Sequence, residues 1–204
     1  MRGLNEMRGL ITGASGMVGR NLLNHQGIKV FEILSPDSSE LNLFDYKSTE
    51  LYLFNNKPDL IIHAAGRVGG IQANIKEPVS FLVENLDMGR NIVLASRQVK
   101  VKRLINLGSS CMYPRNGLNP LSEDLVLKGE LEPTNEGYAL AKIAIARLCE
   151  YIQREDNSYQ YKTLIPCNLY GRWDKFDPKH SHMIPAVIEK IHRAKITGQS
   201  EVDI

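Results

Sequence analysis

Three glycines, Gly13, Gly16 and Gly19, separate the first apolar segment of the chain, residues 10–12, from a stretch with helical periodicity that begins at Met17. Gly13 permits a tight turn, Gly16 lets a pyrophosphate approach the backbone, and Gly19 lets the helix pack closely on the sheet. The free N–H groups at the start of that helix attract an anion. The turn therefore predicts a βαβ unit that binds a dinucleotide, and it limits the fold to the α/β class.

Short apolar segments and amphipathic segments alternate along the rest of the chain. This alternation is typical of a parallel sheet whose strands are connected by helices on both faces. We therefore predict a Rossmann-like, doubly wound parallel sheet, followed by the start of a small second unit. Function should lie at the carboxyl ends of the strands, where the Gly-, Pro- and Asn-rich segment 108–137 is expected to form loops. The expected strands cover residues 10–12, 30–34, 60–62, 103–107 and 162–165, and the expected helices cover residues 17–23, 46–55, 79–98, 138–154 and 184–194.

Charge and cysteine content argue against several other classes. The sequence carries 25 basic and 23 acidic residues, a formal net charge of +2, which argues against a dedicated nucleic-acid binder. No apolar run approaches the ~18 residues of a membrane span, and the polar N-terminus lacks the apolar core of a secretory signal. Cys111, Cys149 and Cys167 show no CxxC spacing. We therefore expect a cytoplasmic protein with free thiols and no metal site.

Tyr138 and Lys142 are four residues apart in an expected helix, so their side chains share one helix face. Reduction of a ketone by hydride leaves an alkoxide that needs a proton from a well-placed acid. A tyrosine pKa of about 10 must fall by roughly three units to suit neutral pH, and an ammonium about 4 Å away supplies roughly the 4 kcal/mol required. Ser109 follows the fourth expected strand, where its hydroxyl can bind a substrate carbonyl. These three residues predict a hydride-transfer site.

The glycine spacing, taken with Tyr138 and Lys142, resembles the extended short-chain dehydrogenases/reductases. Longer strings narrow the resemblance to the GDP-L-fucose synthase family, which acts on GDP-4-keto-6-deoxy-D-mannose. The resemblance runs from about Met7 to the end of the chain. The strings that carry it are AAGRVGGI at 64–71, GSSCMYP at 108–114, LEPTNEGYALAK at 131–142, PCNLYG at 166–171 and SHMIPA at 181–186.

This resemblance implies epimerisation at C3 and C5 of the keto-sugar, followed by reduction at C4 with NADPH. Ser109, Tyr138 and Lys142 would carry the reduction, and Cys111 and His182 would act as base and acid in the epimerisation. A thiol and an imidazole suit that task because both titrate near neutral pH. Cofactor contacts are implied for Gly13, Ser15, Gly16, Met17, Val18, Gly19, Leu43, Ala64, Ala65, Leu107, Gly108, Tyr138, Lys142, Pro166, Asn168, Leu169 and His182.

The substrate implied by the resemblance is a GDP-sugar, contacted by Ser109 at the sugar and by Lys190 at the diphosphate. Ser35, at the expected end of the second strand, is neither the acidic residue typical of NAD sites nor the arginine typical of NADP sites. NADPH is therefore expected from the resemblance, and NAD stays open. A homodimer through the two long helices is implied by the resemblance alone.

We expect two units, an NAD(P)-binding Rossmann unit at 7–171 and part of a sugar-nucleotide unit at 172–204. Members of the resembled family are longer, so we expect a C-terminally truncated chain with an incomplete GDP pocket. One alternative is another extended epimerase or ketoreductase that acts on a nucleotide sugar. A second is a truncated, non-catalytic NAD(P)-binding or interaction protein. A dehydratase is disfavoured, because it would need a carboxylate pair where Ser110 and Cys111 stand.

Overall fold

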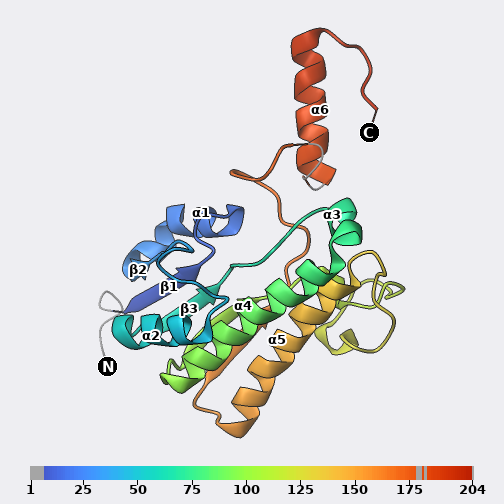
Figure 1. Ribbon diagram of the computed structural model, residues 1–204. Helices are drawn as coiled ribbons and strands as arrows, with labels where there is room; N and C mark the ends of the chain where they lie inside the picture. The colour runs from blue at the N-terminus through green and yellow to red at the C-terminus, as the bar shows by residue number, and fades with distance from the viewer. Residues whose placement is uncertain (1–6, 178–180, 182, 204) are drawn as a thin grey trace.

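Five parallel strands form one sheet in the order β2-β1-β3-β4-β5, as Figure 1 shows. The computed structural model describes residues 7–177, 181 and 183–203. In chain order the elements are β1 (Arg8–Thr12), α1 (Met17–Asn24), the 3-10 helix η2 (Gln26–Val30), β2 (Glu32–Leu34), α2 (Tyr46–Asn56), β3 (Leu60–His63), α3 (Ile71–Lys76), α4 (Pro78–Gln98), β4 (Arg103–Leu107), the 3-10 turns η3 (Ser110–Met112) and η4 (Glu123–Leu125), α5 (Glu136–Glu155), β5 (Gln160–Leu164) and α6 (Met183–Thr197).

The strand order reverses direction at β1. This strand pairs with β2 on one side and with β3 on the other, in a register that sets Thr12 opposite His63. The connections on either side of β1 therefore run in opposite directions along the sheet, and the loops after β1 and β3 diverge. Ligands of open α/β sheets bind in the crevice at such a reversal, outside the carboxyl ends of the strands. The predicted doubly wound sheet is confirmed.

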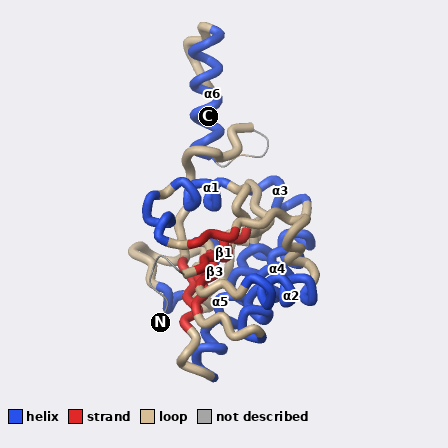
Figure 2. The backbone as a smooth tube through the Cα atoms, turned by 90° about the vertical axis from the view of Figure 1, so that its left-hand side faces the viewer, coloured by secondary structure: helices blue, strands red, loops and turns tan. Residues whose placement is uncertain are grey.

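Helices α2, α4 and α5 pack side by side on one face of the sheet, and α1 lies on the other side of β1 (Figures 1 and 2). Side chains alternate across a strand, and along β3 and β4 every second residue is buried. The apolar ones, Ile61 and Leu104, join apolar residues of α2, α4 and α5 in the main core cluster. Its fully buried members include Leu10, Leu53, Ile61, Ile92, Leu104, Ile152 and Tyr161.

The second strand is shorter than the sequence predicts. Residues 26–30 form η2 and only Glu32–Leu34 pair as β2, so the expected strand over 30–34 is wrong in its first half. The ring of His25 accepts a hydrogen bond from the amide of Gly27, and the amide of Phe31 donates to the carbonyl of Ile28. These local bonds hold the backbone in a turn, and Val30 is left 41% exposed.

The other expected elements lie within a few residues of their predicted positions. The fifth strand begins two residues earlier than expected and ends one residue earlier, at Gln160–Leu164, and α3 was not expected. Helix α6 projects away from the sheet in both views (Figures 1 and 2). Even α4, with 21 residues, is not apolar enough to cross a bilayer, and the same holds for every other helix in the described part of the chain.

Candidate active site

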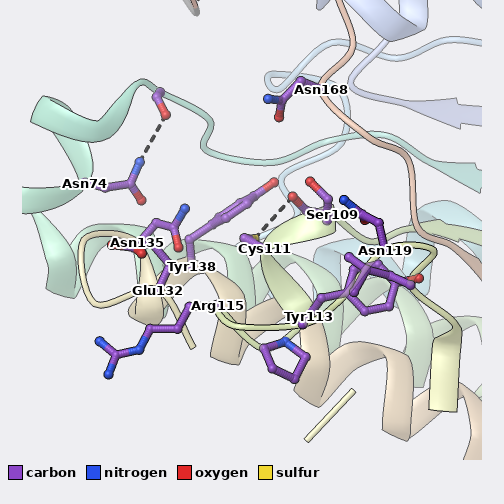
Figure 3. A pocket seen from close by; sticks show the side chains of 15 residues that line it. Asn74, Ser109, Cys111, Tyr113, Arg115, Asn119, Glu132, Asn135, Tyr138 and Asn168 are labelled. Atoms are coloured by element: carbon purple, nitrogen blue, oxygen red, sulfur yellow. Dashed lines mark hydrogen bonds between the residues drawn. The ribbon is translucent and has the colours of Figure 1, made fainter. Parts of the chain in front are cut away.

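A pocket of about 390 Å³ opens beside the loop that follows β4 (Figure 3). Ser109 and Cys111 reach it from that loop, Tyr138 from the first turn of α5, and Asn168 from the segment after β5. Parallel strands place their carboxyl ends at one edge, which explains why residues so far apart in the chain meet here. The pocket therefore brings together four of the residues singled out from the sequence.

The glycine turn leaves no room for side chains at two of its three glycines. A Cβ on Gly13, whose φ is +69°, would lie 2.6 Å from the amide nitrogen of Ala65, and one on Gly19 would lie 2.3 Å from the carbonyl oxygen of Gly13. At Gly16 the nearest atom would be 3.3 Å away, again the carbonyl oxygen of Gly13. Ser15 and Gly16 are exposed. The backbone at the start of α1 is thus accessible, as binding of a pyrophosphate requires.

The first turn of α1 also lacks an anion of its own. Gly16 is the N-cap, no side chain caps the helix, and the first turn contains no acidic residue. The N–H groups of Met17 and Val18 therefore have no side-chain acceptor there. A helix N-terminus of this kind favours a negative group of a ligand. The geometry fits the dinucleotide phosphate predicted from the sequence.

A buried hydrogen bond joins the ends of β1 and β3 beneath this turn. The hydroxyl of Thr12 and Nδ1 of His63 are 2.8 Å apart, and both side chains are buried. The amide of Ala65 donates to the same hydroxyl at 3.4 Å, and the amide of Ala64 donates to the carbonyl of Thr12 at 3.3 Å. Burial, with a contribution from the charge of Lys142, lowers the pKa of His63 to about 3. His63 is therefore neutral and forms a buried, hydrogen-bonded part of the crevice wall.

Ser109 and Cys111 interact directly. The thiol of Cys111 donates to the hydroxyl oxygen of Ser109 at 3.2 Å (Figure 3). Burial raises the pKa of the Cys111 thiol, while the bond to Ser109 and the charge of Lys142 act in the opposite direction. The backbone here is fixed by β5, because Gly108 donates to the carbonyl of Leu164 at 2.8 Å and Ser110 donates to that of Pro166 at 3.1 Å.

Lys142 lies behind the ring of Tyr138. Its ammonium is 5.6 Å from the ring centroid and donates to the carbonyl of Leu107 at 2.9 Å. Burial lowers the pKa of Lys142 to about 8. Burial also raises the pKa of Tyr138, and a hydrogen bond to Ser109 offsets this only in part. The lowered tyrosine pKa expected from the sequence is therefore absent here, because burial raises the pKa of Tyr138 more than the hydrogen bond to Ser109 lowers it.

Two further residues support Tyr138 and were not predicted. The ring of Phe81 packs edge-on against Tyr138, and the guanidinium of Arg67 lies 5.2 Å from the centroid of Phe81. Arg67 is held by ion pairs with Glu77 and Glu84, the latter at 3.0 Å. The sequence string around Arg67 pointed to this loop, but nothing in the periodicity of α4 distinguished Phe81 from an ordinary core residue.

The acidic residues nearest to the expected ribose site are Glu32, which opens β2, and Asp37, which follows it, and both make local contacts. Glu32 pairs with Arg8 at 2.9 Å. One carboxylate oxygen of Asp37 accepts from the amides of Ser39 and Glu40, and Glu40 in turn accepts from the amide of Asp37. The hydroxyl of Ser39 donates to the same oxygen at 2.6 Å, and this bond together with the two amide bonds lowers the pKa of Asp37. An NAD site binds the ribose 2′-hydroxyl with a carboxylate. Here the carboxylates of Glu32 and Asp37 both already have partners within the protein.

Not every predicted contact residue lies at the pocket. Leu43 belongs to the buried core, and its carbonyl accepts from Asn91 at 2.8 Å. Lys190 lies on α6, away from the pocket, and its ammonium donates to the carbonyl of Asp203 at 2.8 Å. His182 falls outside the described residues. The structure thus groups the reduction residues with Cys111 and does not bring Lys190 to them.

A sequence profile of the NAD dependent epimerase/dehydratase family matches residues 9–203. Among curated proteins, the GDP-L-colitose synthase of Yersinia pseudotuberculosis is 59% identical over 198 residues, which cover 97% of this chain and 64% of that protein. The GDP-L-fucose synthase of Azorhizobium caulinodans is 50% identical over 195 residues, which cover 96% of this chain and 62% of that protein. The chain thus spans less than two thirds of the length of either relative.

The fold agrees with the solved structure of a GDP-sugar synthase. A GDP-D-glycero-L-gluco-heptose synthase from Campylobacter jejuni, with a crystal structure in the presence of NADPH, is 31% identical and superposes with a TM-score of 0.88 over 96% of this chain and 57% of that one. The profile match extends over nearly all of the chain, including the glycine turn and the Ser109–Tyr138 pocket. The chain belongs to the NAD dependent epimerase/dehydratase family.

Proposed function

We propose that this chain carries the cofactor site and the catalytic residues of an NADPH-dependent epimerase/reductase for a GDP-linked 4-keto-6-deoxy sugar. The substrate is GDP-4-keto-6-deoxy-D-mannose and the product is GDP-L-fucose. The observation that carries the proposal is the convergence of Ser109, Cys111 and Tyr138 on one pocket, with Lys142 behind the tyrosine. The two curated relatives are, by their names, synthases of GDP-linked sugars. The homodimer and the cytoplasmic location stay predictions.

NADPH fits the crevice at the ends of β1 and β3. The backbone of Ser15, Gly16 and Met17 would hold its pyrophosphate, and Pro166, Asn168 and Leu169 would lie along its nicotinamide half. NADPH is favoured over NADH because the carboxylate of Asp37, which follows β2, is engaged and because the Campylobacter relative was crystallised in the presence of NADPH. When bound, the cofactor supplies the hydride that the ketone carbon receives.

The chain's own residues supply the proton for this reduction. The hydroxyl of Ser109 binds the C4 carbonyl oxygen, and Tyr138 transfers its phenolic proton to that oxygen as the alkoxide forms. The raised pKa of Tyr138 keeps the phenol protonated until then. The ammonium of Lys142 stabilises the phenolate that is left. One hydride and one proton convert the ketone to an alcohol, so the step balances.

Cys111 is the proposed base for epimerisation. Protons on carbons next to a carbonyl are acidic, and inversion needs a base on one face of the sugar and an acid on the other. The Cys111 sulfur lies 3.2 Å from the Ser109 oxygen, next to the group that binds the carbonyl. The base is its thiolate, which the charge of Lys142 favours against the effect of burial. His182 is the acid implied by the family resemblance. A simple ketoreductase would not need a thiol at this position.

The reductase proposal is tested by following NADPH and NADH oxidation with GDP-4-keto-6-deoxy-D-mannose. Tyr138→Phe should lower kcat by at least 10²-fold, because the proton donor is lost. Tyr151→Phe is the matched control, since Tyr151 lies on the same helix but is 51% exposed. Failure to bind either cofactor would overturn the dinucleotide site. Cofactor binding without turnover would favour a non-catalytic binding protein, and full activity of Tyr138→Phe would remove the proposed proton donor.

The epimerase role is tested separately by proton exchange. Wild-type protein incubated with the substrate in D₂O should incorporate deuterium at C3 and C5, as NMR would show. Cys111→Ser should lose this exchange by at least 10²-fold, because a serine hydroxyl is a far weaker base than a thiolate. Cys167→Ser is the control, because Cys167 is an exposed free cysteine. Undiminished exchange in Cys111→Ser would exclude the thiol as the base.

A further inference from the structure

Two buried amide oxygens beside Tyr138 have no hydrogen-bond partner among the residues that the structure describes. They are Oδ1 of Asn74 and Oδ1 of Asn135. Both side chains line the pocket that also contains Ser109 and Tyr138. In Figure 3 they lie on one side of the Tyr138 ring, with Ser109 on the other. Buried acceptors in proteins are nearly always paired, so these two oxygens indicate a ligand that brings donors.

Asn74 is held in a fixed orientation. Only 5% of this residue is exposed. Its amide nitrogen donates to the carbonyls of Gly69 at 3.0 Å and Gly70 at 3.1 Å. Because two carbonyls require the nitrogen on that side, the amide cannot be reversed without placing oxygen against oxygen. Oδ1 is therefore kept on the side of the amide that faces away from these two carbonyls, where it has no partner among the described residues.

Asn135 occupies the N-cap position of α5, where an asparagine oxygen ordinarily accepts from an N–H group of the first helical turn. Asn135 makes no such bond. Its backbone is nevertheless fixed, since its amide donates to the carbonyl of Glu132 at 3.2 Å and its carbonyl accepts from Ala139 at 3.0 Å. The Asn135 side chain, three residues before Tyr138, therefore does not cap α5, although asparagine is well suited to that role.

The chemistry of the proposed substrate identifies the donors. This step rests on the proposed function, which sets the C4 ketone beside the phenol of Tyr138. Of the two ring carbons next to C4 in a 6-deoxy sugar, C5 carries the ring oxygen and the methyl group, and only C3 carries a hydroxyl. The next hydroxyl along the ring is at C2. Two unpaired acceptors from residues that line one pocket therefore match two neighbouring hydroxyl donors on one side of the ketone.

We propose that Asn74 and Asn135 determine specificity by accepting hydrogen bonds from the C3 and C2 hydroxyls of the sugar. The substrate is then a 3-hydroxy-4-keto sugar and not its 3-deoxy counterpart. This distinction separates fucose from colitose, the two sugars in the names of the curated relatives, because colitose lacks the 3-hydroxyl. A site built to bind a hydroxyl discriminates strongly against the analogue that lacks it, because the protein acceptor is left unpaired.

The test compares kcat/KM for GDP-4-keto-6-deoxy-D-mannose and GDP-4-keto-3,6-dideoxy-D-mannose, with NADPH oxidation as the signal. Wild-type protein should prefer the 3-hydroxy sugar by at least 10-fold. Asn135→Ala and Asn74→Ala should each bring this preference close to unity. Asn135→Asp keeps an acceptor oxygen and suits a helix N-terminus, so it should retain the preference. Asn56→Ala is the control, because Asn56 makes a similar amide bond in α2, to the carbonyl of Tyr52.

The outcomes separate this inference from the proposed function. Equal rates with both sugars in the wild type, or an unchanged preference in Asn135→Ala, would overturn the inference and leave the reductase intact. No NADPH oxidation with either sugar would overturn the proposed function, and the inference with it. If Asn74→Ala unfolds the α3 loop because its amide bonds are lost, Asn135→Ala alone decides the test. Asn135→Ala removes no capping bond.

Discussion

The ring of Phe81 meets the ring of Tyr138 edge-on, with centroids 6.4 Å apart and planes at 84°. Phe81 is only 3% exposed and belongs to α4, whereas Tyr138 belongs to α5. Arg67 covers the Phe81 ring from the loop after β3. The plane of the tyrosine ring is therefore set by packing from two other segments of the chain.

Replacing Phe81 with leucine should impair the proposed proton transfer more than substrate binding. The smaller side chain removes the edge contact, so the phenol loses its fixed orientation. We expect kcat to fall several-fold with KM nearly unchanged, and the free energy of unfolding to fall by about 1–2 kcal/mol. Steady-state kinetics and urea unfolding measure both. Phe54→Leu is the control, since Phe54 is 61% exposed on α2. A change in KM alone would contradict a positioning role.

The glycine turn offers a matched pair of substitutions. Gly19→Ala places a Cβ 2.3 Å from the Gly13 carbonyl oxygen, and because both groups are backbone the clash cannot be relieved by a rotamer change. We expect a loss of about 1–3 kcal/mol in unfolding free energy and loss of NADPH binding. Gly16→Ala should keep the fold, because its Cβ has 3.3 Å of space, yet weaken NADPH binding at the exposed turn. Thermal unfolding and NADPH fluorescence titration distinguish the two, and equal stability of both variants would contradict the geometry.

Much of the fold was predictable because its signals are local. The turn at Gly13–Gly19 and the periodicity of α4 and α5 depend on residues close together in sequence. The error at Val30 arose because a propensity for strand was outweighed by the hydrogen bond from Gly27 to the His25 ring. A side-chain cap of this kind leaves no trace in apolar periodicity.

The site was predictable only where a motif carried it. Tyr138 and Lys142 share a helix face, so their proximity follows from spacing alone. The support from Phe81 and the unpaired oxygen of Asn74 arise from contacts across segments, which no single stretch of sequence encodes. The pKa of Tyr138 was misjudged for the same reason. Its burial depends on the packing of α4 and the β4 loop, and that burial raises the pKa of Tyr138.

Acid should destabilise the protein through His63. The pKa of this buried imidazole is about 3 in the folded state, against 6.5 as its ordinary value. Between these two pH values the unfolded chain binds a proton that the folded chain does not, so stability rises with pH across this window. The contribution is about 1.4 kcal/mol per pH unit.

Urea unfolding of the wild type and of His63→Gln from pH 7 to pH 4 measures this dependence. The glutamine can keep a hydrogen bond to Thr12 without titrating, so the variant should show a shallower loss of stability on acidification. His25→Gln serves as the control, because His25 is exposed. Parallel pH profiles for the wild type and His63→Gln would rule out the assignment.

Lys142 should make activity and stability respond to alkaline pH in opposite directions. Its pKa is about 8 in the folded state and 10.5 ordinarily. As pH rises through 8 the folded protein loses the ammonium that stabilises the Tyr138 phenolate, so kcat/KM should fall above pH 8. Over the range from 8 to 10.5 the unfolded chain binds the extra proton, so this residue's contribution to stability rises with pH.

Lys142→Met removes a buried charge and should therefore raise the unfolding free energy at pH 7 by about 1–2 kcal/mol while lowering activity. The stability gain should shrink toward pH 10, because the wild-type lysine is then neutral in the folded state. A stability difference that does not vary with pH, measured by urea unfolding at pH 7, 8.5 and 10, would show that the lysine is not held with a lowered pKa.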